Sequence, residues 1–170
     1  DGLRWHSAAY DYVADINQVI QTMPQPPILV GHSMGGYVVQ KYLETHQAAA
    51  GVLLASLPVS GLFGFAVRYG LRHPLSLLKS QLLLNNWCLI ETPELAQEAF
   101  FSPDMSAAEV ERHFSRLQPE SFRVTFEMML LNLPRPDRVK TSMLVLAAAN
   151  DRVFSVAEEQ ATAIAYGTEA

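Results

Sequence analysis

Residues 28–44 constrain the fold more than any other part of the sequence. Ile28-Leu29-Val30 is a short apolar run without polar alternation, which is typical of a parallel strand buried on both faces. Gly31-His32-Ser33-Met34-Gly35-Gly36 follows directly, and helix-compatible spacing then covers residues 34–46. A strand that turns into a helix at a glycine-rich corner predicts one βα unit of a parallel α/β sheet.

Two further apolar runs have the same character. They are Gly51-Val52-Leu53-Leu54-Ala55 and Met143-Leu144-Val145-Leu146-Ala147. An amphipathic helix, for which Ser7 is a candidate cap, precedes the first strand and stops at Pro24. Another helix, for which Ser155 is a candidate cap, extends to Tyr166 and follows the last strand. The alternation predicts an α/β fold with a doubly wound, mostly parallel sheet.

Between residues 58 and 140 the pattern changes to helical pieces punctuated by Pro and Gly, without a strand signal of similar quality. The pieces are Phe63 to Leu71, Pro74 to Leu84, Ala107 to Leu117 and Glu120 to Leu131. We therefore predict three segments: sheet core over 1–57, a helical insertion over 58–140, and continuation of the core over 141–170.

Composition excludes several classes of protein. The chain has 170 residues, 49% of them hydrophobic, and its net charge of −5 has basic residues scattered rather than clustered, which argues against nucleic acid as a partner. No apolar run is long enough for a transmembrane helix. The single cysteine, Cys88, reads as a small buried hydrophobe, and this usage fits a reducing, cytoplasmic location. The first residues carry neither an initiator Met nor a signal-peptide pattern, so the chain is expected to be part of a longer protein.

The glycine-rich corner also satisfies Gly-x-Ser-x-Gly between a strand and a helix, which is the context that a nucleophilic serine requires. Steric crowding at such a turn predicts glycine on both sides of the serine, at Gly31 and Gly35. The Met34 N–H, at the start of the helix, can donate to an oxyanion. The alternatives are a turn without chemistry and a phosphate-binding turn, but neither Gly-x-Gly-x-x-Gly nor Gly-Lys-Ser/Thr occurs here.

At these residues the sequence resembles the α/β-hydrolase superfamily, in particular its esterase, lysophospholipase and monoacylglycerol-lipase members. Residues 31–36 look like the family's nucleophile elbow. Residues 143–154 are similar to the strand and loop that supply the acid, which assigns that role to Asp151. The helical insertion stands where the family inserts a cap over its active site.

The resemblance implies that two parts of the site lie outside this chain. The family's first oxyanion donor follows its third strand, which would precede Asp1, and its histidine follows its eighth strand, which would come after Ala170. No histidine follows Asp151, although the family's order is serine, acid, histidine. We therefore expect the chain as it stands to lack its catalytic histidine and to be inactive.

Competing residues are weighed by position. Asp137 stands among basic residues, and Asp104 lies in a turn of the insertion. Asp151 instead lies in the loop past a strand's carboxyl end, where α/β sites assemble. The remaining alternative for Asp151 is a residue that only forms the turn. His32 adjoins the serine at a tight turn, where consecutive side chains point apart. For the other histidines, surface or core roles are favoured, and metal binding has no support. These histidines are His6, His46, His73 and His113.

The insertion is rich in large apolar side chains. One interpretation is that these side chains fill the core of the insertion, and the other is that several of them line an apolar pocket under the cap. The side chains are Phe63, Phe65, Trp87, Phe100, Phe101, Phe114, Phe122, Phe126, Met128 and Met129.

The sequence thus predicts a serine hydrolase that cleaves a carboxylic ester or related acyl bond of a small apolar substrate through an acyl-enzyme, without a cofactor or metal. Two alternatives stay open. One is a relative that uses the same residues on other bonds, such as a carbon–carbon hydrolase, a proline iminopeptidase-like peptidase or a cofactor-free haloperoxidase. The other is a non-catalytic receptor of the same fold. Neither the acyl chain length nor the oligomeric state follows from the sequence.

Overall fold

The computed structural model describes residues 9–169 of the chain. Its centre is a parallel sheet of three strands in the order β1 (Ile28–Ser33), β2 (Ala50–Ser56) and β3 (Met143–Leu146). Val30 of β1 pairs with Val52 of β2, which pairs in turn with Leu144 of β3. The three predicted strands and their parallel arrangement are confirmed, and with them the α/β fold class.

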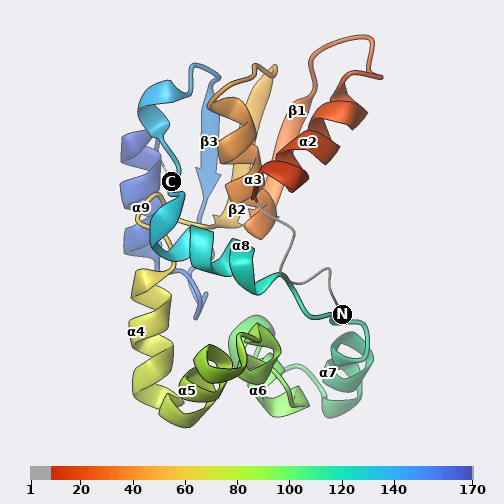
Figure 1. The fold of residues 1–170 in the computed structure, drawn as a ribbon, viewed down its shortest axis with the longest axis vertical. Coiled ribbons are helices and arrows are strands. Elements are labelled where there is room, and N and C mark those ends of the chain that lie inside the picture. The colour runs from red at the N-terminus through yellow and green to blue at the C-terminus, as the bar shows by residue number, and fades with distance from the viewer. Residues whose placement is uncertain (1–8, 170) are drawn as a thin grey trace.

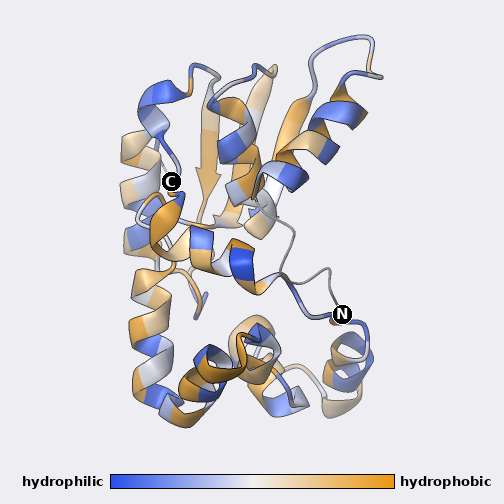
Figure 2. Cartoon of the chain, viewed as in Figure 1, coloured by the Kyte–Doolittle hydropathy of each residue, from blue (hydrophilic) through white to orange (hydrophobic). Residues whose placement is uncertain are grey.

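Three helices pack on one face of this sheet: α2 (Ala9–Ile20), α3 (Met34–Leu43) and α9 (Val156–Ala165). Inward side chains of all three strands meet them in one apolar cluster, and the strands are mostly hydrophobic apart from the carboxyl end of β1 (Figure 2). The buried members of the cluster are Val39, Tyr42, Leu43, Leu53, Met143, Val145 and Ala163. Burial of this set stabilises the sheet against its helices.

The opposite face of the sheet differs from the prediction that the strands are buried on both sides. Ile28 is 62% exposed and Val30 66%, and the outward side chains of β2 and β3, namely Leu54, Leu144 and Leu146, are also exposed. The reason is geometric: along a strand, side chains alternate between faces, and α2, α3 and α9 all cover the same one. Within residues 9–169, the expectation of burial on both faces is wrong.

The region between β2 and β3 is helical, and most of it lies beyond the carboxyl ends of the strands, before the chain returns to the amino end of β3 (Figure 1). Its elements are α4 (Phe63–Arg72), α5 (Pro74–Leu83), η1 (Asn86–Leu89), α6 (Pro93–Phe100), α7 (Ala107–Phe114), α8 (Phe122–Phe126), η2 (Glu127–Leu131) and η3 (Pro136–Arg138). The four predicted helical pieces are present, although the last is α-helical only to Phe126 and π-helical beyond it. The exact limits of the insertion stay a prediction.

Helix α2 stops earlier than the sequence predicts, whereas the start of α9 agrees with the prediction. Helix α2 ends at Ile20, before Met23, and its candidate cap Ser7 lies outside the described residues. Helix α9 begins as predicted, because the Ser155 hydroxyl accepts from the Glu158 N–H while the Glu158 carboxylate accepts from the Ser155 N–H. This reciprocal pair closes the first turn of α9.

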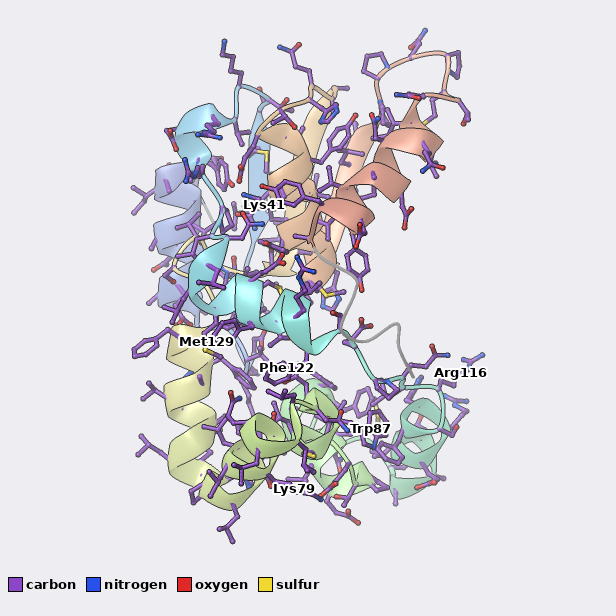
Figure 3. The ribbon with its side chains drawn as sticks, viewed as in Figure 1. Lys41, Lys79, Trp87, Arg116, Phe122 and Met129 are labelled. Atoms are coloured by element: carbon purple, nitrogen blue, oxygen red, sulfur yellow. The ribbon has the colours of Figure 1, made fainter. Side chains whose placement is uncertain are left out.

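Helix α3 also holds the end of the helical region. The Tyr37 hydroxyl donates to the Asn132 carbonyl at 3.0 Å. The Lys41 ammonium, labelled in Figure 3, forms a buried ion pair with Glu44 at 2.7 Å, and Glu44 accepts from the Arg135 N–H at 3.0 Å. The chain therefore returns to the sheet against the same helix that begins at Ser33.

Candidate active site

Ser33 ends β1 in a conformation that few residues other than glycine adopt, with φ 52° and ψ −121°. The pairing of β1 with β2 shifts between His32 and Ser33, and Ala55 on β2 also has a positive φ, of 39°. The Ser33 carbonyl accepts from the Leu57 N–H at 3.3 Å, which ties the turn to the segment after β2. Backbone strain held in place by its surroundings is a common feature of active sites.

The glycines of residues 31–36, the elbow, differ in how closely other atoms approach them. A Cβ on Gly31 would lie 2.5 Å from the Gly35 carbonyl oxygen, so Gly31 is required by a close backbone approach. A Cβ on Gly36 would overlap the Ser56 hydroxyl, whereas no described atom lies within 4 Å of a Cβ on Gly35. The steric argument therefore applies to Gly31 and to Gly36, which faces β2 one residue further into α3. For Gly35 it stays a prediction, because no described atom outside α3 and the adjacent residues crowds a Cβ there.

Met34 is the first residue of α3, and amides of the first helical turn have no partner within the helix. Its side chain packs against an apolar group that we call the elbow cluster. The buried members of this cluster are Ala9, Tyr37, Val38, Leu57, Leu62, Val124, Met128 and Phe154. Because they come from α2, α3, the segment after β2, the helical region and the loop after β3, one core joins all five beside the serine.

Asp151 lies in residues 147–155, which we call the acid loop, after the carboxyl end of β3. Its Oδ1 accepts from the Val153 N–H at 2.7 Å and from the Phe154 N–H at 3.2 Å. Phe154 is buried in the elbow cluster, so its packing anchors the acid loop. Two amides thus orient the Asp151 carboxylate through one oxygen, while the side chain stays partly exposed.

The acid loop is also held from the helical region. Arg68 of α4 donates to the Val153 carbonyl at 2.6 Å and to both carboxylate oxygens of Glu158, at 3.2 and 2.8 Å. Burial works to raise the pKa of Glu158, but hydrogen bonds from Arg68 and Ser155 outweigh it and lower that pKa. The sequence contains a signal for half of this arrangement, since Ser-x-x-Glu at residues 155–158 is a capping box; nothing in it points to Arg68.

Glu159 was missed by the sequence reasoning. It is 1% exposed, on the face of α9 toward Ser56, and neither of its carboxylate oxygens has a well-formed hydrogen bond within residues 9–169. Burial first, and then the negative charge of Asp151, raise its pKa from 4.5 to about 7, against a smaller opposing effect of the Ser56 backbone. No local pattern in the sequence distinguishes Glu159 from the exposed carboxylates.

This carboxyl makes stability depend on pH. As pH rises from 4.5 toward 7, the unfolded chain releases the Glu159 proton while the folded chain retains it, so the free energy of unfolding falls. The full decrease in the free energy of unfolding, reached above pH 7, is about 3 kcal/mol for a pKa shift of this size. Glu159→Gln should therefore match the parent near pH 5 in urea melts and exceed it by roughly 1–3 kcal/mol at pH 8. A parallel Glu111→Gln control, at an exposed site on α7, should show no such divergence; equal curves for Glu159→Gln and its parent at both pH values would refute this account.

The described histidines do not hydrogen-bond to the serine. Within residues 9–169, no imidazole is within hydrogen-bonding distance of the Ser33 hydroxyl, and the neighbouring His32 is exposed. His46 stacks on Tyr42, His113 packs on Phe101, and His73 contacts Glu98 at 3.0 Å, a carboxylate that its sequence neighbourhood did not indicate. His6 lies outside the described residues.

The other candidates stay apart from the elbow. Asp137 is exposed in η3 and Asp104 is exposed in the turn before α7. Cys88 is buried and free. Residues 9–169 contain no group of three or more His, Cys, Asp or Glu side chains that could hold a metal, and none of the helices described is long and apolar enough to cross a bilayer.

A small apolar hollow of about 30 Å³ lies among α4, α5, η1, α8 and η2. Phe122 and Met129 border it, and Figure 3 shows both between α8–η2 and the lower helices. Four of the ten apolar residues singled out in the insertion line it, namely Phe65, Phe122, Phe126 and Met129. Leu62 and Met128 of the elbow cluster adjoin these walls, so the hollow is close to the packing around Met34.

Comparison with known proteins places the chain in a family. None of the curated proteins compared with it matches. One solved structure, described as Est816, an N-acyl homoserine lactone degrading enzyme, superposes with a TM-score of 0.53 at 19% identity, over 98% of this chain and 66% of that protein. At this identity the likeness shows the fold alone, and the chain spans just under two thirds of that structure's length. A profile of the Alpha/beta hydrolase family matches residues 3–169, and the chain therefore belongs to the Alpha/beta hydrolase family.

Proposed function

We propose that the protein is a serine hydrolase that cleaves a carboxylic ester or a related acyl bond, with Ser33 as nucleophile and Asp151 as acid. The observation that carries the proposal is the backbone of Ser33, strained at φ 52° at the junction of β1 and α3. Such a conformation costs roughly 1–3 kcal/mol and persists where it serves a function. Membership in the hydrolase family supports hydrolysis as the reaction class.

In this proposal the Ser33 Oγ attacks the substrate carbonyl carbon and gives its proton to a histidine. The resulting oxyanion accepts a hydrogen bond from the Met34 N–H at the positive end of α3. The intermediate then expels the alcohol, which takes the proton back from the imidazolium. Water hydrolyses the acyl-Ser33 ester by the same sequence of proton transfers.

The base is then a histidine outside residues 9–169, because none within them reaches Ser33. The positions of the two strands support this arrangement: β1 and β3 are separated by β2 alone, and next-but-one strands lie about 10 Å apart. An imidazole between their carboxyl ends can contact Ser33 on one side and Asp151 on the other.

The apolar side chains around the small hollow in the helical region support an apolar substrate. The walls of this hollow are mainly Leu, Phe and Met side chains, which favour an acyl chain over a charged group. Lactones are cyclic esters that open by the same chemistry, and the structural neighbour is described as degrading one class of them. We therefore include both open-chain esters and N-acyl lactones among the candidate substrates.

The test is to incubate the full-length protein with p-nitrophenyl esters of increasing chain length, with N-acyl lactones, and with a fluorophosphonate. We expect an initial burst of p-nitrophenol, label on the peptide that contains Ser33, and a preference for apolar acyl groups. A protein that binds these ligands without turnover, and whose Ser33 stays unlabelled, would be a ligand receptor of the same fold and would overturn the proposal.

A further inference from the structure

Arg68 and Asp151 form hydrogen bonds with opposite ends of the same peptide unit. The carbonyl of Val153 and the N–H of Phe154 belong to one planar peptide. The Arg68 guanidinium donates to that carbonyl at 2.6 Å, while the Asp151 Oδ1 accepts from that N–H at 3.2 Å. The plane therefore cannot rotate without breaking one of these contacts.

The guanidinium is itself held in place by a carboxylate. Glu158 receives it through both oxygens, and the same carboxylate caps α9 by accepting from the Ser155 N–H at 2.8 Å and from the Ser155 hydroxyl at 2.7 Å. A bidentate pair of this kind fixes direction as well as distance. The side chains of Arg68 and Glu158 are 34% and 18% exposed, so solvent screens the contact only in part.

We infer that Arg68 is a positioning residue for Asp151, acting from the helical region through the Val153–Phe154 peptide. This inference rests on the proposed function, in which Asp151 orients the histidine. The cation draws electron density toward the Val153 oxygen, which makes the Phe154 N–H a stronger donor to the carboxylate. The helical insertion thereby sets the direction of the acid in addition to covering the site.

The first test compares Arg68→Met with the parent in full-length protein, using p-nitrophenyl butyrate. Loosening a catalytic group by about 1 Å costs about 10²-fold, so kcat should fall by that factor while KM changes less than about 3-fold. Arg72→Met is the matched control. Arg72 stands one turn later on α4, and its only ion pair within residues 9–169 is with Glu98, at 3.8 Å, so kcat of this variant should stay at the parental value. A parental kcat for Arg68→Met would overturn the inference.

The second test separates positioning from general stability. If Arg68 acts only through the acid, Arg68→Met should cost less than about 3-fold in kcat when added to Asp151→Asn, because coupled residues are non-additive. A full 10²-fold loss in that background would assign Arg68 a structural role and overturn the inference.

Rescue experiments keep the inference testable if Arg68→Met folds poorly. Arg68→Lys keeps the charge but loses the planar, two-point hydrogen bonding of the guanidinium, and its kcat should be higher than that of Arg68→Met. A hollow between α4, α6 and the acid loop borders both Arg68 and Val153, so millimolar guanidinium should restore part of the activity of Arg68→Ala. Absence of both rescues would contradict the inference.

Ser33→Ala, measured alongside, separates failure of the proposed function from failure of the positioning role. If Ser33→Ala retains turnover, the proposed function fails. If Ser33→Ala is inactive and Arg68→Met has a normal kcat, the positioning role alone fails.

Discussion

Replacing Ser33 by alanine is expected to lower kcat by about 10⁶-fold in the full-length protein, which is the cost of removing the nucleophile from a comparable triad. The fold should persist, because the backbone strain at φ 52° is nearly the same for alanine and serine, and no described residue hydrogen-bonds to the Ser33 hydroxyl. The measurement is the steady-state rate on p-nitrophenyl esters, together with the midpoint of thermal unfolding.

The matched control is Ser60→Ala, at an exposed serine in the segment before α4. It should keep the parental rate and the parental melting temperature. Esterase activity that survives in a pure Ser33→Ala preparation would remove Ser33 from its proposed role.

Asp151→Asn should lower kcat by roughly 10⁴-fold, because the histidine would lose the group that fixes its tautomer and stabilises its charged form. The substitution is well suited to this site. An asparagine carbonyl can still accept from the Val153 and Phe154 amides, so the acid loop keeps its shape while the negative charge disappears.

Asp104→Asn, at an exposed position far along the helical region, serves as the control and should be neutral. Near-normal activity in Asp151→Asn would show that another carboxylate is the acid, and Asp137→Asn would then be the first variant to examine.

The sequence predicted those features that depend on neighbours in the chain. The three strands are short apolar runs, and α9 begins where Ser155 and Glu158 form a capping box, both of which are local patterns. Helix α6 was missed although Thr92 caps it and Pro93 occupies its first turn, which are local signals of the same kind. Family resemblance, rather than residue pattern, singled out Asp151.

The features that were missed or wrong depend on residues that are distant in sequence. Arg68 and Glu158 are 90 positions apart, and His73 meets Glu98 across 25. The requirement for Gly36 arises from Ser56 on the neighbouring strand. Burial of the sheet on both faces was inferred from apolar composition alone, which cannot say on which side the helices pack.

The connections of the sheet differ greatly in length, and this bears on the order in which the protein folds. Residues 34–49 join β1 to β2, whereas residues 57–142, about five times as many, join β2 to β3. Closing the longer connection as a flexible loop costs about 1.5 kcal/mol more. We therefore expect β1, α3 and β2 to form the folding nucleus, so that substitutions in α3 slow folding while those in β3 mainly speed unfolding. Tyr37 and Lys41 of α3 can then bind residues 132–135 and shorten the remaining loop before β3 pairs. On this route the serine turn is shaped early and the acid loop arrives last, so a partly folded chain would hold a formed elbow without its carboxylate.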